Sequence, residues 1–170
     1  MQIIAYNSDL YRNISEASNS VKGLAIISVF MEVGPLLDKF MFEVVRTLKI
    51  IKEKGESAPI KDTPLSHIIP NTTEYVTYEG SLTYPGCYET VTWILLNKPM
   101  WIAKEQLYSL RSIYNGRENQ PFLKLESNAR PVMQLNHRVV RTNINSHKRS
   151  RLCTFEKDMF YQVNTRFDRA

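Results

Sequence analysis

Residues 24–33, LAIISVFMEV, place the strongest constraint on the fold, because apolar residues occupy both of their alternating faces. Successive side chains of an extended strand point to opposite sides of a sheet, so Leu24 and Ile26 share one face and Ala25 lies on the other. A strand with one apolar face suits a solvated sheet surface, whereas a strand with two is typical of a buried, central position. The stretch therefore predicts one long central strand with packing on each side.

Periodicity elsewhere predicts a mainly β chain with short helices. Further strands are expected at residues 1–7, 90–96, 101–103 and 139–143. A helix is expected from residue 37, with Gly55 just after its end, because apolar side chains recur at helical spacing at Leu37, Phe40, Val44, Leu48 and Ile51. Residues 104–111 predict a short surface helix, and the prolines within residues 56–71 predict a loop with one short helical turn.

The composition limits the classes of function. With 170 residues, of which 43% are hydrophobic, the chain is long enough for one domain with a sizeable core. The sequence contains no apolar run long enough to span a bilayer, no phosphate-binding glycine loop, no paired-cysteine metal motif and no nucleophile signature. Its histidines are far apart in polar surroundings, so no metal site is expected from His67, His137 and His147.

The run YEGSLTYPGCYETVTW, residues 78–93, resembles the signature of the α-carbonic anhydrases. Other segments match that family in the same order, namely MQIIAYN at 1–7, GLAIISVFMEVG at 23–34, the stretch 36–58, WILLNKPMWIAKEQLYSLR at 93–111 and NARPVMQLNHR at 128–138. The resemblance covers nearly everything from residue 1 to about residue 145. Within the family, the segments PGCYETVTW and RVVRTNIN are most similar to the acatalytic carbonic anhydrase-related proteins X and XI.

The resemblance implies a partial α-carbonic anhydrase fold. Its expected form is a central twisted mixed β-sheet with short helices that lacks its N-terminal strands. Residues 1–145 are then the C-terminal part of an α-carbonic anhydrase-like domain, and residues 146–170 are a basic, flexible tail. The family's secretory leader and first strands are expected to precede residue 1.

The resemblance also implies that the zinc site of the catalytic relatives is lost. Gln2 stands where the family's third zinc-binding histidine lies, and the strand that carries the other two histidines has no counterpart in these residues. Zinc-hydroxide chemistry needs three imidazoles to bring the pKa of the bound water to about 7, and an amide oxygen is a poor zinc ligand. The chain is therefore expected to bind no cofactor and to be a pseudoenzyme with no catalytic residue.

Strand parity places the remaining pocket positions of the family on one side of the sheet, and three more lie on the signature loop. We call these the vestigial pocket residues: Gln2, Ile4, Ile26, Leu82, Thr83, Tyr84, Val91 and Trp93. In catalytic relatives the Thr83 hydroxyl would accept a hydrogen bond from the zinc-bound hydroxide. Tyr84 replaces a small residue and is expected to narrow the cleft. Gly86 replaces a proline that follows a cis bond, so a trans bond and a reshaped loop are expected here.

Two further features favour the secretory route. Asn13 and Asn71 each begin an N-glycosylation sequon, NIS and NTT, in polar surroundings typical of surface turns. Extracellular members of the family hold a cysteine at the position of Cys87, paired with one near the N-terminus that is absent from these residues. Cys87 is then either a small buried apolar side chain or the disulfide partner of Cys153. The alternative for Cys153 is an intermolecular disulfide. The subgroup that the chain resembles is secreted and implies cell-surface partners of the neurexin kind.

The net charge of +5 is concentrated towards the C-terminus. The basic patch contains no acidic residue and comprises Arg138, Arg141, Lys148, Arg149 and Arg151. Such a run is typical of a solvated tail or of a site for an acidic polysaccharide or acidic protein, and nucleic acid is not expected for a secreted protein. Three functions remain open: an acatalytic protein that acts through extracellular protein interactions, a zinc-dependent carbonic anhydrase, and a polyanion-binding module.

Overall fold

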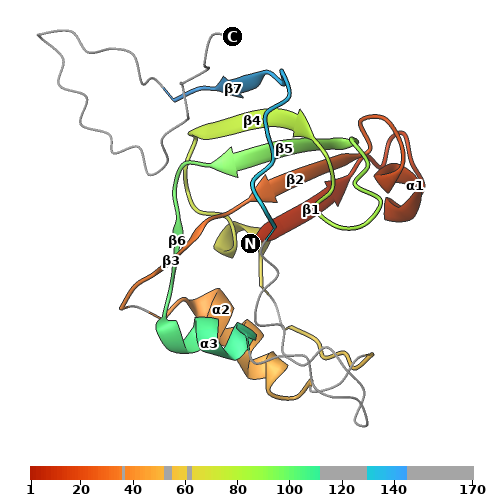
Figure 1. Cartoon of the computed structure of the whole chain (residues 1–170). Helices are drawn as coiled ribbons and strands as arrows, with labels where there is room; N and C mark the ends of the chain where they lie inside the picture. Colours follow the sequence, from red (N-terminus) through yellow and green to blue (C-terminus); the bar gives the residue numbers. More distant parts are fainter. Residues whose placement is uncertain (36, 52–54, 61–62, 112–129, 145–170) are drawn as a thin grey trace, which may run out of the picture. The chain divides into compact units, whose positions relative to one another are not determined.

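Five strands form one mixed sheet in the first of the two units into which the chain divides (Figure 1). The computed structural model describes residues 1–35, 37–51, 55–60, 63–111 and 130–144. Unit 1 comprises residues 1–30, residues 72–99 and the chain from residue 137, and unit 2 comprises residues 31–71 and 100–136. The sheet of unit 1 contains β1 (Gln2–Tyr6), β2 (Leu24–Ser28), β4 (Tyr75–Gly80), β5 (Val91–Leu96) and β7 (Val140–Thr142).

The strand order in this sheet is β1-β2-β5-β4-β7. Strands β2 and β5 run parallel, which requires a long crossover connection, and the other neighbouring pairs are antiparallel. Both β2 and β5 have a hydrogen-bonded neighbour at each edge, so both are internal strands of the sheet. The expected mixed β-sheet with short helices is confirmed.

One face of this sheet carries the hydrophobic core of unit 1. Residues directly opposite one another on paired strands share a face, so the register aligns Ile4, Ile26 and Trp93 in one row. The buried cluster on this side comprises Ala17, Leu24, Ile26, Leu82, Val91 and Trp93. Burying a side chain the size of Leu or Ile contributes about 1.5–3 kcal/mol relative to leaving it exposed. This cluster is therefore the main source of stability in unit 1.

Helix α1 (Ile14–Ser18) packs against the same core at one end of the sheet. Its Ala17 is fully buried, and the Thr90 hydroxyl donates a hydrogen bond of 2.8 Å to the carbonyl oxygen of Ser18. Gly23, directly before β2, lies so close to this helix that a Cβ atom would stand 1.8 Å from the Ala17 carbonyl oxygen. The end of the helix and the start of β2 therefore pack backbone against backbone.

Unit 2 contains two helices that pack together and a small parallel sheet. Its elements are β3 (Met31–Val33), α2 (Lys39–Leu48), the 3-10 turn η1 (Leu65–His67), β6 (Met100–Ile102) and α3 (Lys104–Arg111). Gln106 of α3 is buried, and its Oε1 accepts hydrogen bonds from the backbone amides of Asp38 and Ala103. The Gln106 Nε2 donates to the Asp38 carbonyl at 2.8 Å. One side chain thus joins the start of α3 to the start of α2.

The prediction of one long strand over residues 24–33 was wrong. Strand β2 ends at Ser28, and β3 pairs with β6 in a separate two-stranded sheet. Val29 between them is fully buried and donates its amide to the Met1 carbonyl. A chain that passes from one sheet to another keeps its two-residue apolar alternation, so the pattern alone does not reveal the break.

The remaining elements agree with the sequence to differing degrees. The short turn η1, helix α3 and strands β1, β5, β6 and β7 lie within a residue or two of their expected positions. Helix α2 ends at Leu48, well before Gly55, so Gly55 does not follow its last turn as expected. Gly55 has a φ of 99° and occupies a separate turn. Helix α1 and strand β4 were not among the expected elements.

Candidate functional site

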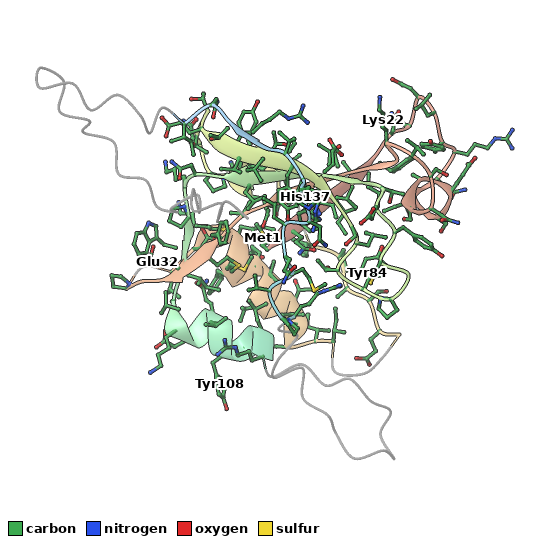
Figure 2. The ribbon with its side chains drawn as sticks, turned by 45° about the horizontal axis from the view of Figure 1, so that its top comes forward. Met1, Lys22, Glu32, Tyr84, Tyr108 and His137 are labelled. Carbon is green, nitrogen blue, oxygen red and sulfur yellow. The ribbon has the colours of Figure 1, made fainter. Side chains whose placement is uncertain are left out.

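The sheet register brings the strand members of the vestigial pocket residues onto one face. Ile4 lies opposite Ile26, which lies opposite Trp93. Gln2 and Val91 belong to the same face, because each is two residues along its strand from a member of this row. The loop between β4 and β5 carries the other three, and Figure 2 shows Tyr84 on this loop.

Burial divides the vestigial pocket residues into two groups. Four of them are almost completely buried, with Trp93 the most exposed at 5%: Ile26, Leu82, Val91 and Trp93. The other four are exposed: Gln2, Ile4, Thr83 and Tyr84. The buried group belongs to the hydrophobic core of unit 1, so in this structure these residues pack the fold instead of lining an open site.

Trp93 is held by a specific set of contacts. Its indole Nε1 donates to the Ser81 carbonyl at 3.1 Å, and its ring stacks on Tyr78 with centroids 6.3 Å apart. Gly80 leaves the space for this pair, because a Cβ atom there would stand 3.0 Å from both rings. Burial raises the pKa of the Tyr78 hydroxyl, and the positive charge of Arg138 opposes that rise. The Tyr78 hydroxyl is therefore neutral at physiological pH and supplies no base.

The loop between β4 and β5, which we call the signature loop, contains a tight turn. The Cys87 amide donates to the Tyr84 carbonyl at 3.0 Å, with Pro85 and Gly86 between them. Proline followed by a residue at positive φ is the pattern of a type II turn, and Gly86 has a φ of 108°. The Pro85–Gly86 peptide bond is trans, as expected for a glycine in place of the family's proline. The loop is closed by a second bond of 3.0 Å, from the Leu82 amide to the Tyr88 carbonyl.

The described donors do not fit a zinc ion. No group of three or more His, Cys, Asp or Glu side chains in the described part of the chain is close enough to hold a metal. The side chain of Gln2, the residue that the sequence resemblance singles out as a ligand position, is an exposed neutral amide on β1. Zinc prefers thiolate, imidazole and carboxylate ligands, so the residues present do not form the site.

The candidate modification sites are at the surface. Asn13 and Asn71 are both exposed. Cys87 is exposed as well, so the interpretation of this residue as a small buried apolar side chain was wrong. It occupies the turn with a φ of 43°, and its Sγ lies 3.4 Å from the Tyr84 carbonyl oxygen. Cys153 lies outside the described residues.

Both described residues of the basic patch have identified neighbours, an acidic one for Arg141 and an aromatic one for Arg138. Arg141 lies 3.8 Å from Glu79, and both side chains are mostly exposed. An exposed ion pair of this kind contributes about 0–1 kcal/mol, so Arg141 remains available to a stronger anionic partner. Arg138 is half-buried near Tyr78. Lys148, Arg149 and Arg151 lie outside the described residues.

Unit 2 contains a cleft of about 1010 Å³ that the sequence did not indicate. The first turns of α2 line it, together with Thr63 and His67. Its charges are mixed, and Arg46 already pairs with Glu43 at 2.6 Å. None of the vestigial pocket residues contributes to it. Among the described helices, none is long and apolar enough to cross a membrane.

The mixed sheet and its signature loop define the class of protein. The sequence profile of the eukaryotic-type carbonic anhydrases matches residues 1–144, and the chain belongs to this α-carbonic anhydrase family. Carbonic anhydrase-like protein 1 of Caenorhabditis elegans is 39% identical over 148 residues, covering 87% of this chain and 40% of that protein. Carbonic anhydrase-like protein 2 of the same organism is 40% identical over 146 residues, covering 85% of this chain and 43% of that protein. The chain thus spans about two fifths of the length of these relatives and forms a partial carbonic anhydrase domain.

Proposed function

We propose that this protein is an acatalytic carbonic anhydrase-related protein, close to the proteins X and XI of that family, that acts by binding other proteins outside the cell. The observation that carries the proposal is Gln2. By its resemblance to the family, this neutral amide occupies a zinc-ligand position. No group of three or more His, Cys, Asp or Glu side chains in the described residues could hold a metal in its place. The two relatives from Caenorhabditis elegans are themselves named carbonic anhydrase-like.

The packing around the site supports the same proposal. Hydration of carbon dioxide by a metal-bound hydroxide needs a shaped, open cavity beside the metal. Leu82, Val91 and Trp93 belong to the packed core of unit 1, so the shape of such a cavity depends on the loop residues beside them. The half-exposed ring of Tyr84 stands at the loop where the catalytic relatives have a small residue.

The test of acatalysis is a zinc and activity measurement on the purified chain. We expect well under one equivalent of zinc after incubation with the metal and desalting, and no hydration of carbon dioxide above the buffer rate. Gln2→His should leave both results unchanged, because one imidazole does not provide the three that the chemistry needs. A catalytic carbonic anhydrase assayed in parallel is the positive control. Stoichiometric zinc together with turnover would favour the second candidate, a zinc-dependent carbonic anhydrase.

The expected mode of action is interaction at the cell surface. The acatalytic subgroup that the chain resembles is secreted and implies receptors of the neurexin kind as partners. Residues 1–145 then form the domain part and residues 146–170 a basic tail that carries Cys153. Arg149 and Arg151 closely precede this cysteine in the sequence and favour its thiolate, which is the reactive form in disulfide exchange. Polyanion binding through the basic patch is the competing mode, favoured by the concentration of the net charge there.

A non-reducing gel distinguishes these two modes. If Cys153 forms a covalent link to a partner, secreted protein should show a heavier species that reductant removes. Cys153→Ser should abolish that species, and the charge variant Lys148→Ala/Arg149→Ala should retain it. Persistence of the species in Cys153→Ser excludes the covalent link. Its loss in the charge variant alone shows that the basic patch steers the encounter.

A further inference from the structure

Asn13 combines a sequence motif with a specific structural position. It opens the sequon NIS and also forms the N-cap of α1, with an extended backbone at φ −156° and ψ 168°. Its Oδ1 accepts a hydrogen bond of 2.9 Å from the amide of Glu16. The Glu16 carboxylate in turn accepts a bond of 3.1 Å from the Arg12 amide. The first bond satisfies a backbone donor in the first turn of the helix, and the second satisfies one just before the N-cap.

This cap engages only the oxygen of the Asn13 side chain. The amide nitrogen Nδ2 takes part in neither bond, and the side chains of Asn13, Ile14 and Ser15 are all exposed. The helix is anchored by Ala17, one turn further along, which is fully buried. A group attached at Nδ2 therefore disturbs neither the cap nor the packing of α1.

We propose that Asn13 carries an N-linked glycan and continues to cap α1 while it does so. In the transfer, Nδ2 forms a bond to C1 of the first sugar of a lipid pyrophosphate-linked oligosaccharide. The bond from C1 to the pyrophosphate oxygen breaks, Nδ2 loses one proton, and the lipid pyrophosphate leaves. The product is a secondary amide whose oxygen remains an acceptor, so the bond from the Glu16 amide persists. The inference rests on the secretory route of the proposed function.

The second sequon provides an internal comparison. Thr73, the hydroxyl residue of NTT, has an exposed side chain, and its backbone carbonyl accepts a bond of 2.6 Å from Asn143 Nδ2. Thr73→Ala removes this sequon and leaves the backbone bond in place. Ser15→Ala removes the first sequon in the same way and leaves Asn13 and its cap intact.

The experiment is translation of the full 170-residue chain behind a cleavable leader into microsomes. We expect slower-migrating protein that an endoglycosidase returns to the unmodified position. Ser15→Ala and Asn13→Asp should each lose the Asn13 component of this shift, and Thr73→Ala should retain it. Asn13→Asp should also keep the unfolding midpoint of the unglycosylated chain, because a carboxylate caps as an amide does, whereas Asn13→Ala should lower it.

Two outcomes would overturn the inference. One is a wild-type chain without a shift, and the other is a shift that Ser15→Ala and Asn13→Asp leave unchanged while Thr73→Ala removes it. Because the added leader delivers the chain to the lumen, either failure concerns Asn13 and not the natural location of the protein. The location is tested separately by whether the endogenous protein is sensitive to the same endoglycosidase.

Discussion

Trp93→Ala is expected to lower the free energy of unfolding by about 3–5 kcal/mol, because it empties the largest side chain from the buried cluster of unit 1. It also leaves the Ser81 carbonyl without the indole donor at 3.1 Å, which costs about 1 kcal/mol more. Domains of this size are stable by about 5–15 kcal/mol, so the variant should lose much of its stability. The measurement is the midpoint of urea-induced unfolding, monitored by circular dichroism.

The matched control is the other tryptophan. Trp101 lies on β6 in unit 2 and is 48% exposed, so Trp101→Ala removes the same side chain without emptying a core. We expect a loss of about 1 kcal/mol or less from this control. Equal losses from the two variants would show that Trp93 is not part of a packed core.

Gly23→Ala is expected to lower the free energy of unfolding by a similar amount. Its cause is a steric clash, whereas that of Trp93→Ala is a cavity. The added Cβ atom would stand 1.8 Å from the Ala17 carbonyl oxygen and 2.8 Å from that of Ser20. Both obstacles are backbone atoms, so a side-chain rotation does not relieve them. Insertion into a packed region costs about 1–3 kcal/mol and occasionally more, and we expect about 3 kcal/mol or more here. Thermal unfolding of the purified variant gives the value.

Gly55→Ala separates this collision from backbone strain. Gly55 has a φ of 99°, and a Cβ atom added to it would meet nothing within 4 Å, so its substitution causes strain without a clash. A residue with a side chain in left-handed backbone costs about 1–2 kcal/mol. A smaller loss from Gly23→Ala than from Gly55→Ala would contradict the close packing of α1 on β2.

The sequence was informative where one periodicity ran unbroken. The strand that begins at Gln2, the strand that ends at Leu96 and helix α3 follow directly from alternation or helical spacing. The division between Ser28 and Met31 did not follow, because both halves are apolar and the change of sheet depends on partners far along the chain. The start of helix α1 also had a sequence signal, because Asn13 and Glu16 have the spacing of a capping box. Asn13 was interpreted only as part of a glycosylation sequon, so this helix was not predicted.

The candidate site shows the same limit. Parity predicted which face Ile4, Ile26 and Trp93 share, and the register bears this out. Parity says nothing about how much of that face is covered, which depends on how the loop with Leu82 folds back over it. The exposure of Cys87 was missed for a related reason, because a turn with Gly86 at positive φ turns the cysteine outward.

The double role of the vestigial pocket residues bears on how activity is inferred for distant members of this family. Leu82, Val91 and Trp93 are required for packing whether or not a metal is bound, since they form the core of unit 1. Gln2 is exposed on β1 and lies outside this core, so packing places no comparable demand on it. A match to this signature is evidence of ancestry and fold. Turnover has to be argued from the ligand positions, which evolve under a different constraint.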